Sequence, residues 1–283
     1  MSVLTVEKVL IRMDRKIGFI GCGNMGRAML DSLLNNHFIK KDNVRVSVKT
    51  DASRKEIAQK WAIETSKDNA EIVRHSDIIF LAVNPKDYQP VIQEIRDITR
   101  DDQIFISIAA GIDLFQLENW FGNKTKIVKT MPNTPVMVNA GMSAICPNEH
   151  VSKDELDQVC SLFSLFGEYE MMEEEDFDAF IALCGSSPAY IFVLIEAMAD
   201  AAVKLGLPRK SAYRMAEQAI LGSAKLALET GSHPAELKDM VCSPGGSTIV
   251  AVAELETQGF RAAIMKAMEK CAEKSKNMHA NMD

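Results

Sequence analysis

Residues 16–26 read KIGFIGCGNMG, a short apolar run followed by a segment with three spaced glycines. Gly21, Gly23 and Gly26 have the spacing G-x-G-x-x-G, and a helical pattern follows them directly. In a βαβ unit the first such glycine allows a tight turn, and the second lets the backbone approach a pyrophosphate at the helix N-terminus. The stretch therefore predicts the start of a dinucleotide-binding fold, with a closely packed turn that binds nothing as the alternative.

Short β-rich runs alternate with helical patterns from this loop to about residue 172. The expected strands are 16–21, 43–48, 77–83, 103–110 and 126–131, and the expected helices between them are 25–36, 53–62 and 88–98. The strands are apolar with little alternation, which is typical of parallel strands buried on both faces. We predict a Rossmann-like, doubly wound and mostly parallel α/β sheet, a dinucleotide-binding domain over residues 14–172.

Beyond about residue 173 the strand patterns disappear and helices are expected instead, at 177–206, 208–231, 233–241 and 248–259. Pro208 and Gly231 stand where helices prefer to begin and end. The first of these helices is apolar nearly all round, and such a helix must be buried against something. We predict an all-helical dimerisation and substrate-binding domain over residues 173–283, and an intertwined homodimer at least.

Composition excludes several classes of protein. The chain has 283 residues, 47% of them hydrophobic, and a net charge of −7 without a block of Lys or Arg. Nucleic acid and membranes are therefore not expected partners, and no apolar run reaches the ~20 residues of a membrane span. The six cysteines form no CxxC pair and the five histidines no HExxH, so we expect no metal and reduced thiols in the cytoplasm. Residues 1–13 are interpreted as an N-terminal extension rather than a signal peptide.

The end of the second expected strand bears on the choice of cofactor. Enzymes that use NAD usually carry an Asp or Glu here that binds the ribose. In this chain Lys49 and Thr50 come first, and Asp51 follows, with Arg54 and Lys55 nearby. A cation and a hydroxyl suit a 2′-phosphate, which favours NADPH over NADH. An exposed Lys49 that binds no ligand is the alternative.

Three further loops follow strands, and we expect them at the edge of the sheet where ligands bind. They are 82–87, 107–113 and 129–141. The last holds prolines on either side of Asn133 and Thr134, so it is expected to be rigid. It either lines the nicotinamide site or is only structural.

A second glycine loop, CSPGGST at 242–248, interrupts the helical half. Gly245 and Gly246 would present free backbone N–H groups at a helix N-terminus, beside the hydroxyls of Ser243, Ser247 and Thr248. Such a loop is too small for a pyrophosphate but suits a carboxylate. An ordinary turn between two helices, with a Ser or Thr cap, is the alternative.

The stretch HPAELKDMVCSPGGSTIVAVAELETQGFRAA, residues 233–263, resembles the signature region of the pyrroline-5-carboxylate reductase family. The stretches IGFIGCGNMG, MPNTP, SSPAYIFVLIEAMADAA and LPRKSAYRMAEQAILGSAKL are similar to that family in order and spacing, so the resemblance covers roughly residues 15–276. It implies an oxidoreductase that reduces 1-pyrroline-5-carboxylate to L-proline with NAD(P)H, by hydride transfer to a C=N bond, as the last step of proline biosynthesis. It also implies a Rossmann domain, a helical dimerisation domain, and assembly into larger rings such as a decamer.

The resemblance implies site residues as well. Together with Lys49, the predicted cofactor-binding residues are Ile20, Gly21, Cys22, Gly23, Asn24, Met25, Gly26, Asn69, Ala82, Asn84 and Ala110. The predicted substrate-binding residues are Glu174, Ser243, Gly245, Gly246, Ser247 and Thr248. Thr248 is the predicted catalytic residue, whose hydroxyl orients and polarises the imine nitrogen while solvent or a protonated substrate supplies the proton. Asn84 departs from the family, which usually has Lys in this loop, and this leaves the choice between NADPH and NADH open.

Two other functions share this architecture. Hydroxyacid dehydrogenases resemble one another in using a Lys with a nearby Asn on the helix between the domains, but residues 184–202 contain neither, and the first Lys is Lys204. A Rossmann dimer without enzymatic activity would be expected to lose the loop at 242–248, which is intact. We also expect that the second glycine loop of one chain could complete the site of its partner.

Overall fold

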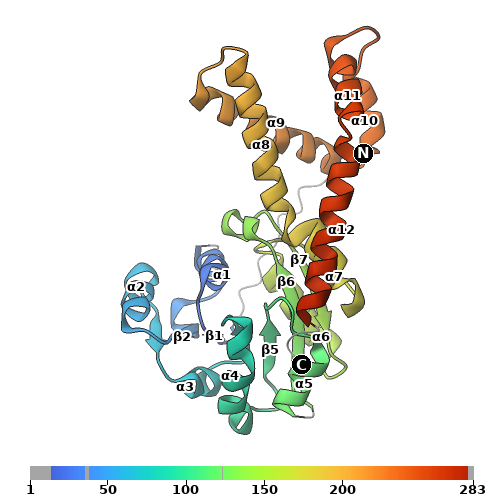
Figure 1. Cartoon of the computed structure of the whole chain (residues 1–283). Coiled ribbons are helices and arrows are strands. Elements are labelled where there is room, and N and C mark those ends of the chain that lie inside the picture. Colours follow the sequence, from blue (N-terminus) through green and yellow to red (C-terminus); the bar gives the residue numbers. More distant parts are fainter. Residues whose placement is uncertain (1–13, 36–37, 123, 280–283) are drawn as a thin grey trace. The chain divides into compact units, whose positions relative to one another are not determined.

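The computed structural model describes residues 14–35, 38–122 and 124–279, so the N-terminal extension 1–13 lies outside the described residues (Figure 1). The chain forms two compact units. The sheet unit runs to Ser186 and also includes the chain from Cys271 on. The helical unit is Ser187–Lys270. The sheet itself ends at Met171, next to the predicted domain boundary between residues 172 and 173.

One eight-stranded sheet forms the sheet unit, in the order β3-β2-β1-β4-β5-β6-β7-β8. The strands are β1 (Ile17–Ile20), β2 (Val44–Ser47), β3 (Glu64–Ser66), β4 (Ile78–Leu81), β5 (Ile104–Ser107), β6 (Lys126–Pro132), β7 (Gly141–Pro147) and β8 (Gly167–Met171). Strands β1 to β6 are parallel, β7 is antiparallel to β6, and β8 is parallel to β7. The predicted doubly wound and mostly parallel sheet is confirmed.

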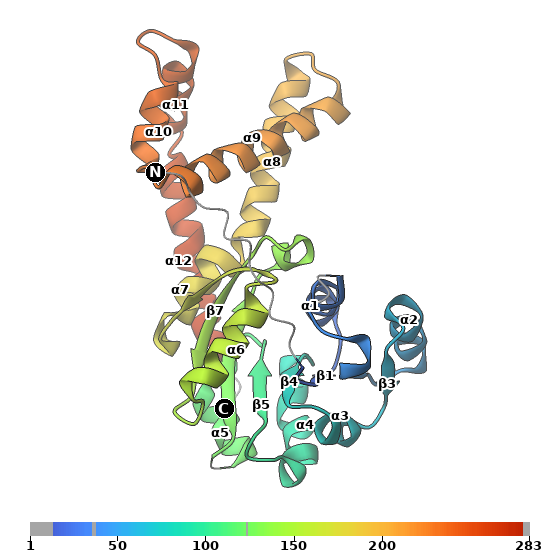
Figure 2. The same ribbon diagram turned by 180° about the vertical axis from the view of Figure 1, so that it is seen from behind.

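Helices cover both faces of this sheet, as the two opposite views show (Figure 1, Figure 2). They are α1 (Asn24–Asn35), α2 (Asp51–Trp61), α3 (Asn69–His75), α4 (Tyr88–Ile95), α5 (Leu114–Phe121), α6 (Lys153–Phe163) and α7 (Phe177–Phe180). Short 3₁₀ turns lie at Lys41–Asn43, Pro85–Asp87, Arg96–Ile98, Thr134–Val138 and Glu174–Asp176. Apolar residues of α1, α2 and α6 belong to one core, and those of α3, α4 and α5 to the other.

The strands are apolar at consecutive positions because neighbouring residues enter different cores. Ile78 and Phe80 of β4 lie in the first core, whereas Ile79 and Leu81 lie in the second. In the first core the ring of Phe19 stacks on that of Phe80 at a centroid distance of 4.7 Å. A strand with period two and two buried faces has no polar side, which is why the sequence pattern shows little alternation.

The structure corrects two expected boundaries. The loop expected at 129–141 begins later, because residues up to Pro132 belong to β6, and Pro132 pairs with Ser143 at the end of the antiparallel ladder. The helix expected over 177–206 is divided into α7, a π-helical turn at Ile181–Gly185, and a separate helix that starts at Ser187. Gly185 and the serines after it favour this break, because they are poor formers of a continuous helix.

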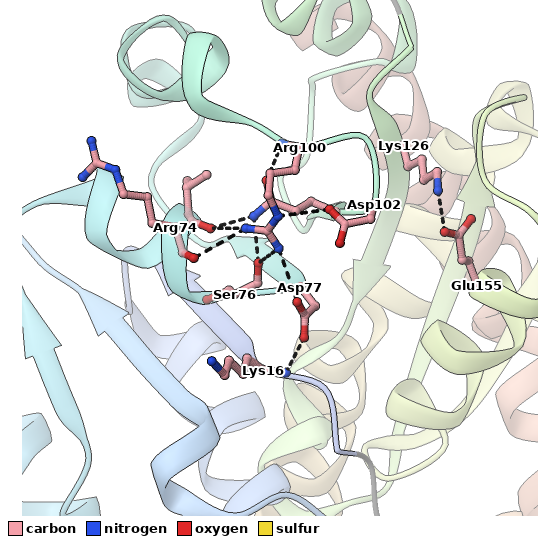
Figure 3. Close-up of polar contacts among 10 residues, drawn as sticks. Lys16, Arg74, Ser76, Asp77, Arg100, Asp102, Lys126 and Glu155 are labelled. Carbon is pink, nitrogen blue, oxygen red and sulfur yellow. Dashed lines mark hydrogen bonds and ion pairs between the residues drawn. The ribbon is translucent and has the colours of Figure 1, made fainter.

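Polar contacts close the amino edge of the sheet, where the strands begin (Figure 3). The Arg100 guanidinium donates to the carbonyl oxygen of Ser76 at 3.2 Å and to the carboxylates of Asp77 and Asp102 at 3.3 and 3.1 Å. The backbone N–H of Lys16, just before β1, donates to Asp77 at 2.9 Å. These groups satisfy the end of α3 and the starts of the neighbouring strands, so this edge is occupied by structural contacts.

The helical unit contains α8 (Ser187–Lys204), α9 (Arg209–Thr230), α10 (Pro234–Val241), α11 (Ser247–Thr257) and the start of α12 (Phe260–His279). Among its described residues the buried apolar side chains are three alanines, Ala199, Ala212 and Ala216. Many larger apolar side chains are more than half exposed in the single chain, namely Phe192, Val193, Leu205, Leu221, Leu228, Met240, Val250 and Met265. The predicted all-helical region is confirmed, and it lacks a large apolar core of its own.

One helical run passes the length and composition test for a membrane span. This run is Glu174–Lys204, and 11% of its apolar window is buried within the chain. The sequence-based expectation that no run reaches such a length therefore needs correction. One such run is weak grounds for a membrane assignment, since a protein–protein interface needs exposed apolar surface of the same kind.

Glu155 joins β6 to α6 and generates a test of the fold. Its carboxylate accepts a hydrogen bond from Lys126 at 2.6 Å (Figure 3). It also accepts one from the Ser152 backbone N–H at 3.0 Å, which completes a capping box. Burial opposes the charged form, but the hydrogen bonds from Lys126 and Ser152 prevail and hold the pKa of Glu155 below its ordinary value of 4.5. Its contribution to stability is therefore present above pH 4.5 and is lost as the pH falls further.

Glu155→Gln should lower the free energy of unfolding by about 1–3 kcal/mol near neutral pH, because a partly buried Lys126 loses its counter-ion. The deficit should shrink as the pH falls below 4.5, where wild-type Glu155 takes up a proton. Urea unfolding over a pH series measures both effects. Glu168→Gln, the same charge change at an exposed position of β8, is the control. A deficit that stays constant with pH would contradict the proposed ionic contribution.

Candidate active site

Gly21 makes the turn that follows β1. Its φ is +81°, a backbone conformation that side chains rarely adopt, and its N–H donates to the carbonyl oxygen of Ser47 at 2.9 Å. A Cβ on Gly21 would lie 2.7 Å from the carbonyl oxygen of Ala82 and 2.6 Å from a methyl group of Val83. Only glycine fits here, between the ends of β2 and β4.

Gly23 and Gly26 stand in different surroundings. A Cβ on Gly23 would meet no atom within 4 Å, whereas a Cβ on Gly26 would lie 3.2 Å from the Cβ of Ala82. Gly23 and Asn24 are exposed, and the Gly23 carbonyl accepts the first helical hydrogen bond from Arg27 at 2.9 Å. The open space at Gly23 and the free N–H groups at the start of α1 fit the pyrophosphate of a dinucleotide.

The remaining residues of this loop are buried or packed against the core and hold the loop in place. Ile20 is fully buried and Met25 packs against the first core. Burial raises the pKa of the Cys22 thiol to about 12, so the thiol is neutral and unreactive near neutral pH. The Cys22 carbonyl accepts a hydrogen bond from the Arg27 guanidinium, which also pairs with Glu56. Of the predicted cofactor residues, Cys22 and Ile20 can contribute only backbone atoms.

Asn69 lies beside the end of β2. Its Oδ1 accepts a hydrogen bond from the Ser47 hydroxyl at 2.7 Å, and its Nδ2 donates to Glu94 at 2.9 Å. Ser47 is the residue whose carbonyl receives the Gly21 N–H, so the first glycine loop and Asn69 share one support. The structure thus brings together two parts of the predicted cofactor site that are far apart in the sequence.

The polar residues after β2 have definite partners. Thr50 is the N-cap of α2, and its hydroxyl accepts from the Ser53 N–H at 3.2 Å. Hydrogen bonds from Lys67 and Arg54 lower the pKa of Asp51, with Lys67 at 2.7 Å. Lys49 lies 3.1 Å from Asp87, which belongs to the loop after β4. The Thr50 hydroxyl expected to bind phosphate is therefore used as a helix cap, and Lys49 is held by another loop.

Tyr88 is a residue that the sequence interpretation missed. It is fully buried at the start of α4, and burial raises the pKa of its hydroxyl to about 12. The hydroxyl donates to the carbonyl oxygen of Leu81 at 2.5 Å and accepts from the N–H of Ile108 at 3.3 Å. It thereby fixes the ends of β4 and β5, from which the loops with Ala82 and Ala110 depart.

The predicted substrate-binding residue Glu174, and Asn133 of the loop expected at 129–141, have structural contacts. Glu174 accepts hydrogen bonds from the Leu114 N–H at 2.8 Å and from Lys129 at 2.7 Å. The Lys129 side chain is only 3% exposed, so Glu174 neutralises a buried cation. Asn133 donates to the carbonyl oxygen of Cys184 in the π-helical turn at 3.0 Å and accepts from the Met142 N–H at 2.9 Å. These contacts give Asn133 a structural role within the sheet unit.

The second glycine loop joins α10 to α11 in the helical unit. Gly245 has a φ of +69°, and a Cβ on Gly246 would lie 2.5 Å from the Ser243 hydroxyl oxygen. The N-cap of α11 is Gly246, and no side chain makes a capping hydrogen bond there. The Ser or Thr cap expected under the alternative of an ordinary turn is therefore not present at the start of α11. The hydroxyls of Ser247 and Thr248 stand in the first turn of α11, beside the free N–H groups of its N-terminus.

Metal chemistry has no visible basis in the part of the chain that the structure describes. No group of three or more His, Cys, Asp or Glu side chains there is placed to hold a metal ion. The six cysteines are free thiols.

Comparison with known proteins relates both units to one family. Residues 174–278 match a family model described as pyrroline-5-carboxylate reductase dimerisation, and residues 16–111 match one described as NADP oxidoreductase, coenzyme F420-dependent. The pyrroline-5-carboxylate reductase of Escherichia coli is 46% identical over 266 residues, which are 94% of this chain and 99% of that protein. That of Methanosarcina acetivorans is 41% identical over 94% of this chain and 98% of its own. The crystal structure of Plasmodium falciparum pyrroline carboxylate reductase with NADP bound has a TM-score of 0.85 and 33% identity, covering 94% of this chain and 98% of that one.

The open space at Gly23 yields a test of the first loop. Gly23→Val should leave the fold intact apart from about 1 kcal/mol for a poorer N-cap, since its Cβ meets nothing. Its branched side chain would occupy the space of a pyrophosphate, so the affinity for a dinucleotide should fall by at least tenfold. Calorimetric titration with NADPH and thermal unfolding measure the two quantities. Gly21→Val is the matched control, which should lose the fold itself, and unchanged NADPH affinity in Gly23→Val would exclude this loop as the cofactor site.

Proposed function

Because the chain belongs to the pyrroline-5-carboxylate reductase family, we propose that it reduces 1-pyrroline-5-carboxylate to L-proline with NADPH. The observation that carries the proposal is the presence of two different glycine loops, each of which leads into a helix N-terminus with free N–H groups. The loop at Gly21–Gly26 suits a dinucleotide, and the loop at Gly245–Gly246 suits a small carboxylate. A substrate with one carboxylate and one C=N bond matches the second loop.

The sheet unit holds the cofactor in this proposal. NADPH, when bound, supplies the hydride. The N–H groups at the start of α1 bind its pyrophosphate, with Gly23 leaving room for it and Gly21 setting the turn. Two findings support this cofactor: the Plasmodium falciparum relative has NADP bound in its crystal structure, and residues 16–111 match the NADP oxidoreductase model.

The helical unit binds the substrate through the second loop. The N–H groups of Gly245 and Ser247 bind the carboxylate, which the N-terminus of α11 also favours. The Gly246 N–H donates to the Ser243 carbonyl at 3.0 Å and shapes the turn instead. The Thr248 hydroxyl donates a hydrogen bond to the ring nitrogen, whose electron density rises as the C=N bond is reduced. A hydroxyl is a weak acid, so solvent or an already protonated substrate supplies the proton.

Glu174 belongs to the proposed substrate set by resemblance alone. Its contacts with Lys129 and Leu114 add a structural reason for a carboxylate at this position. Neutralising the buried Lys129 keeps β6 and the turn at Glu174–Asp176 together at the end of the sheet.

The chain is an oligomer, since residues 174–278 match a dimerisation domain that includes the exposed apolar helices. We propose a larger ring, such as a decamer, built from these dimers, and the division of labour between residues 14–172 and 173–283 described above. Six free thiols support a cytoplasmic location.

Thr248→Ala tests the catalytic proposal. Wild-type protein should oxidise NADPH when 1-pyrroline-5-carboxylate is added, and the variant should show a kcat lower by about tenfold to a thousandfold. NADPH affinity should barely change, because Thr248 belongs to the other loop. Thr248→Ser, which keeps the hydroxyl, should recover most of the rate. Wild-type kcat in Thr248→Ala would remove this hydroxyl from the mechanism, and inactivity of the wild type with this substrate would reject the function.

We further propose that each active site combines the first loop of one chain with the second loop of its partner. Mixing Gly23→Val with Thr248→Ala, after unfolding and refolding them together, tests this arrangement. A hybrid dimer would have one site with both lesions and one with neither, so random pairing should restore about a quarter of the wild-type sites. If each chain builds its own site, every site keeps one lesion. A mixture without added activity, with hybrids verified by differential tags, would contradict the shared site.

A further inference from the structure

An ion pair crosses the edge of the sheet where the first glycine loop lies. Lys49 follows β2 and Asp87 follows β4, and the distance between Nζ and Oδ1 is 3.1 Å. The two loops are 38 positions apart in the sequence. The Lys49 side chain is 74% exposed, whereas that of Asp87 is 25% exposed. The cation is therefore accessible to a ligand, and the carboxylate is the more fixed partner.

The sheet order gives this pair its place. Strand β1 lies between β2 and β4, and in the parallel register Ile20 is level with both Ser47 and Leu81. The connections reverse direction between β1 and β4, and open α/β sheets bind dinucleotides at such a point. The Lys49–Asp87 pair thus joins the two loops that flank the end of β1.

Lys49, Lys55 and Lys86 are exposed cations of this region, and Lys49 is the one that forms the ion pair with Asp87. Arg54 is 3.2 Å and Lys67 is 2.7 Å from Asp51, and Thr50 caps α2. The loop after β4 carries Asn84 where the family usually has Lys, and Lys86 and Asp87 follow within three residues. The loop therefore keeps one exposed cation in Lys86, and the Asp87 carboxylate faces Lys49.

We propose that Asp87 is a specificity-determining residue that narrows the preference for NADPH over NADH by competing with the 2′-phosphate for Lys49. This inference rests on the proposed use of a nicotinamide dinucleotide. A 2′-phosphate gains Lys49 only by displacing or sharing the Asp87 carboxylate, which also repels it. A ribose 2′-hydroxyl meets no such repulsion, because a carboxylate in this crevice can accept its hydrogen bond. Asp87 thus weakens binding of a 2′-phosphate and favours binding of a ribose 2′-hydroxyl.

Binding of cofactor fragments tests the proposal independently of the catalysed reaction. The measured quantity is the ratio of the dissociation constant of 5′-AMP to that of 2′,5′-ADP, by calorimetry. Asp87→Asn should raise this ratio about three- to tenfold, the scale of a partly exposed charge pair together with the loss of a nearby repulsion. Lys49→Gln should lower it by a similar factor. In the Lys49→Gln background Asp87→Asn should have a smaller effect, because only the repulsion remains.

Two controls separate this effect from changes in net charge or folding. Asp97→Asn makes the same charge change in the turn beyond the far end of α4 and should leave the ratio unchanged. Asp87 makes no side-chain capping hydrogen bond to α4, so Asp87→Asn should unfold at the wild-type temperature. An unchanged ratio in Asp87→Asn or in Lys49→Gln, or an equal rise in Asp97→Asn, would overturn the proposal.

Activity assays then distinguish a failure of the Asp87 proposal from a failure of the proposed reaction. If the enzyme reduces 1-pyrroline-5-carboxylate but Asp87→Asn leaves the fragment ratio unchanged, the specificity proposal alone is wrong. If the ratio changes as expected in a protein that reduces no such substrate, the proposed reaction is wrong and the role of Asp87 stands. Under both proposals Asp87→Asn should raise the ratio of kcat/KM for NADPH over NADH, mainly through KM.

Discussion

The backbone turn at Gly21 is the constraint on which the sheet unit depends. Its N–H reaches the Ser47 carbonyl at the end of β2, and the absence of a side chain lets the Ala82 carbonyl at the end of β4 come close. Three strand ends therefore meet around one residue. This meeting leaves the N-terminus of α1 open at Gly23 while α1 packs on the sheet. It also brings the loops after β2 and β4 near enough for Lys49 to reach Asp87. A methyl group at Gly21 would separate all of these parts.

The sequence predicted the fold where burial was uniform and failed where it was not. Strands such as β4 are buried on both faces, so they appear as continuous apolar runs. Strand β3 is only three residues, Glu64–Ser66, and β8, GEYEM, is an edge strand with exposed acidic side chains. Backbone pairing contributes much of the stability of such strands, with few side chains such as Tyr169 packed on the core, and backbone pairing leaves no mark in the side-chain pattern. The antiparallel β7 was missed for a different reason: it is almost wholly buried, but MSAIC mixes polar and apolar residues, so the sequence does not show that burial.

For the candidate site, sequence spacing predicted what one segment does by itself. The turns at Gly21 and Gly245 have positive φ, which their local sequence signals through glycine, although Gly21 and Gly26 also leave room for Ala82 on a distant strand end. Residues that depend on a distant partner could not be assigned in this way. Lys129 appears as a polar residue at a strand end, but it is buried because Glu174, 45 positions later, neutralises it. The role of the Tyr88 hydroxyl likewise becomes apparent only when β4 and β5 lie side by side, because it makes hydrogen bonds at the ends of both.

The lack of an apolar core in the helical unit has a consequence for how the chain reaches its native state. The sheet unit contains two large apolar cores and can be stable within one chain. The helical unit buries only alanines among its apolar side chains in the described residues, and side chains such as Phe192 and Leu228 are exposed. The last step of folding is then bimolecular, and mass action governs it. Dilution should lower the melting temperature of the helices before that of the sheet. A newly synthesised chain would keep the apolar surface of its helical unit exposed until it meets another copy. The local rate of synthesis therefore affects whether the chain assembles or aggregates.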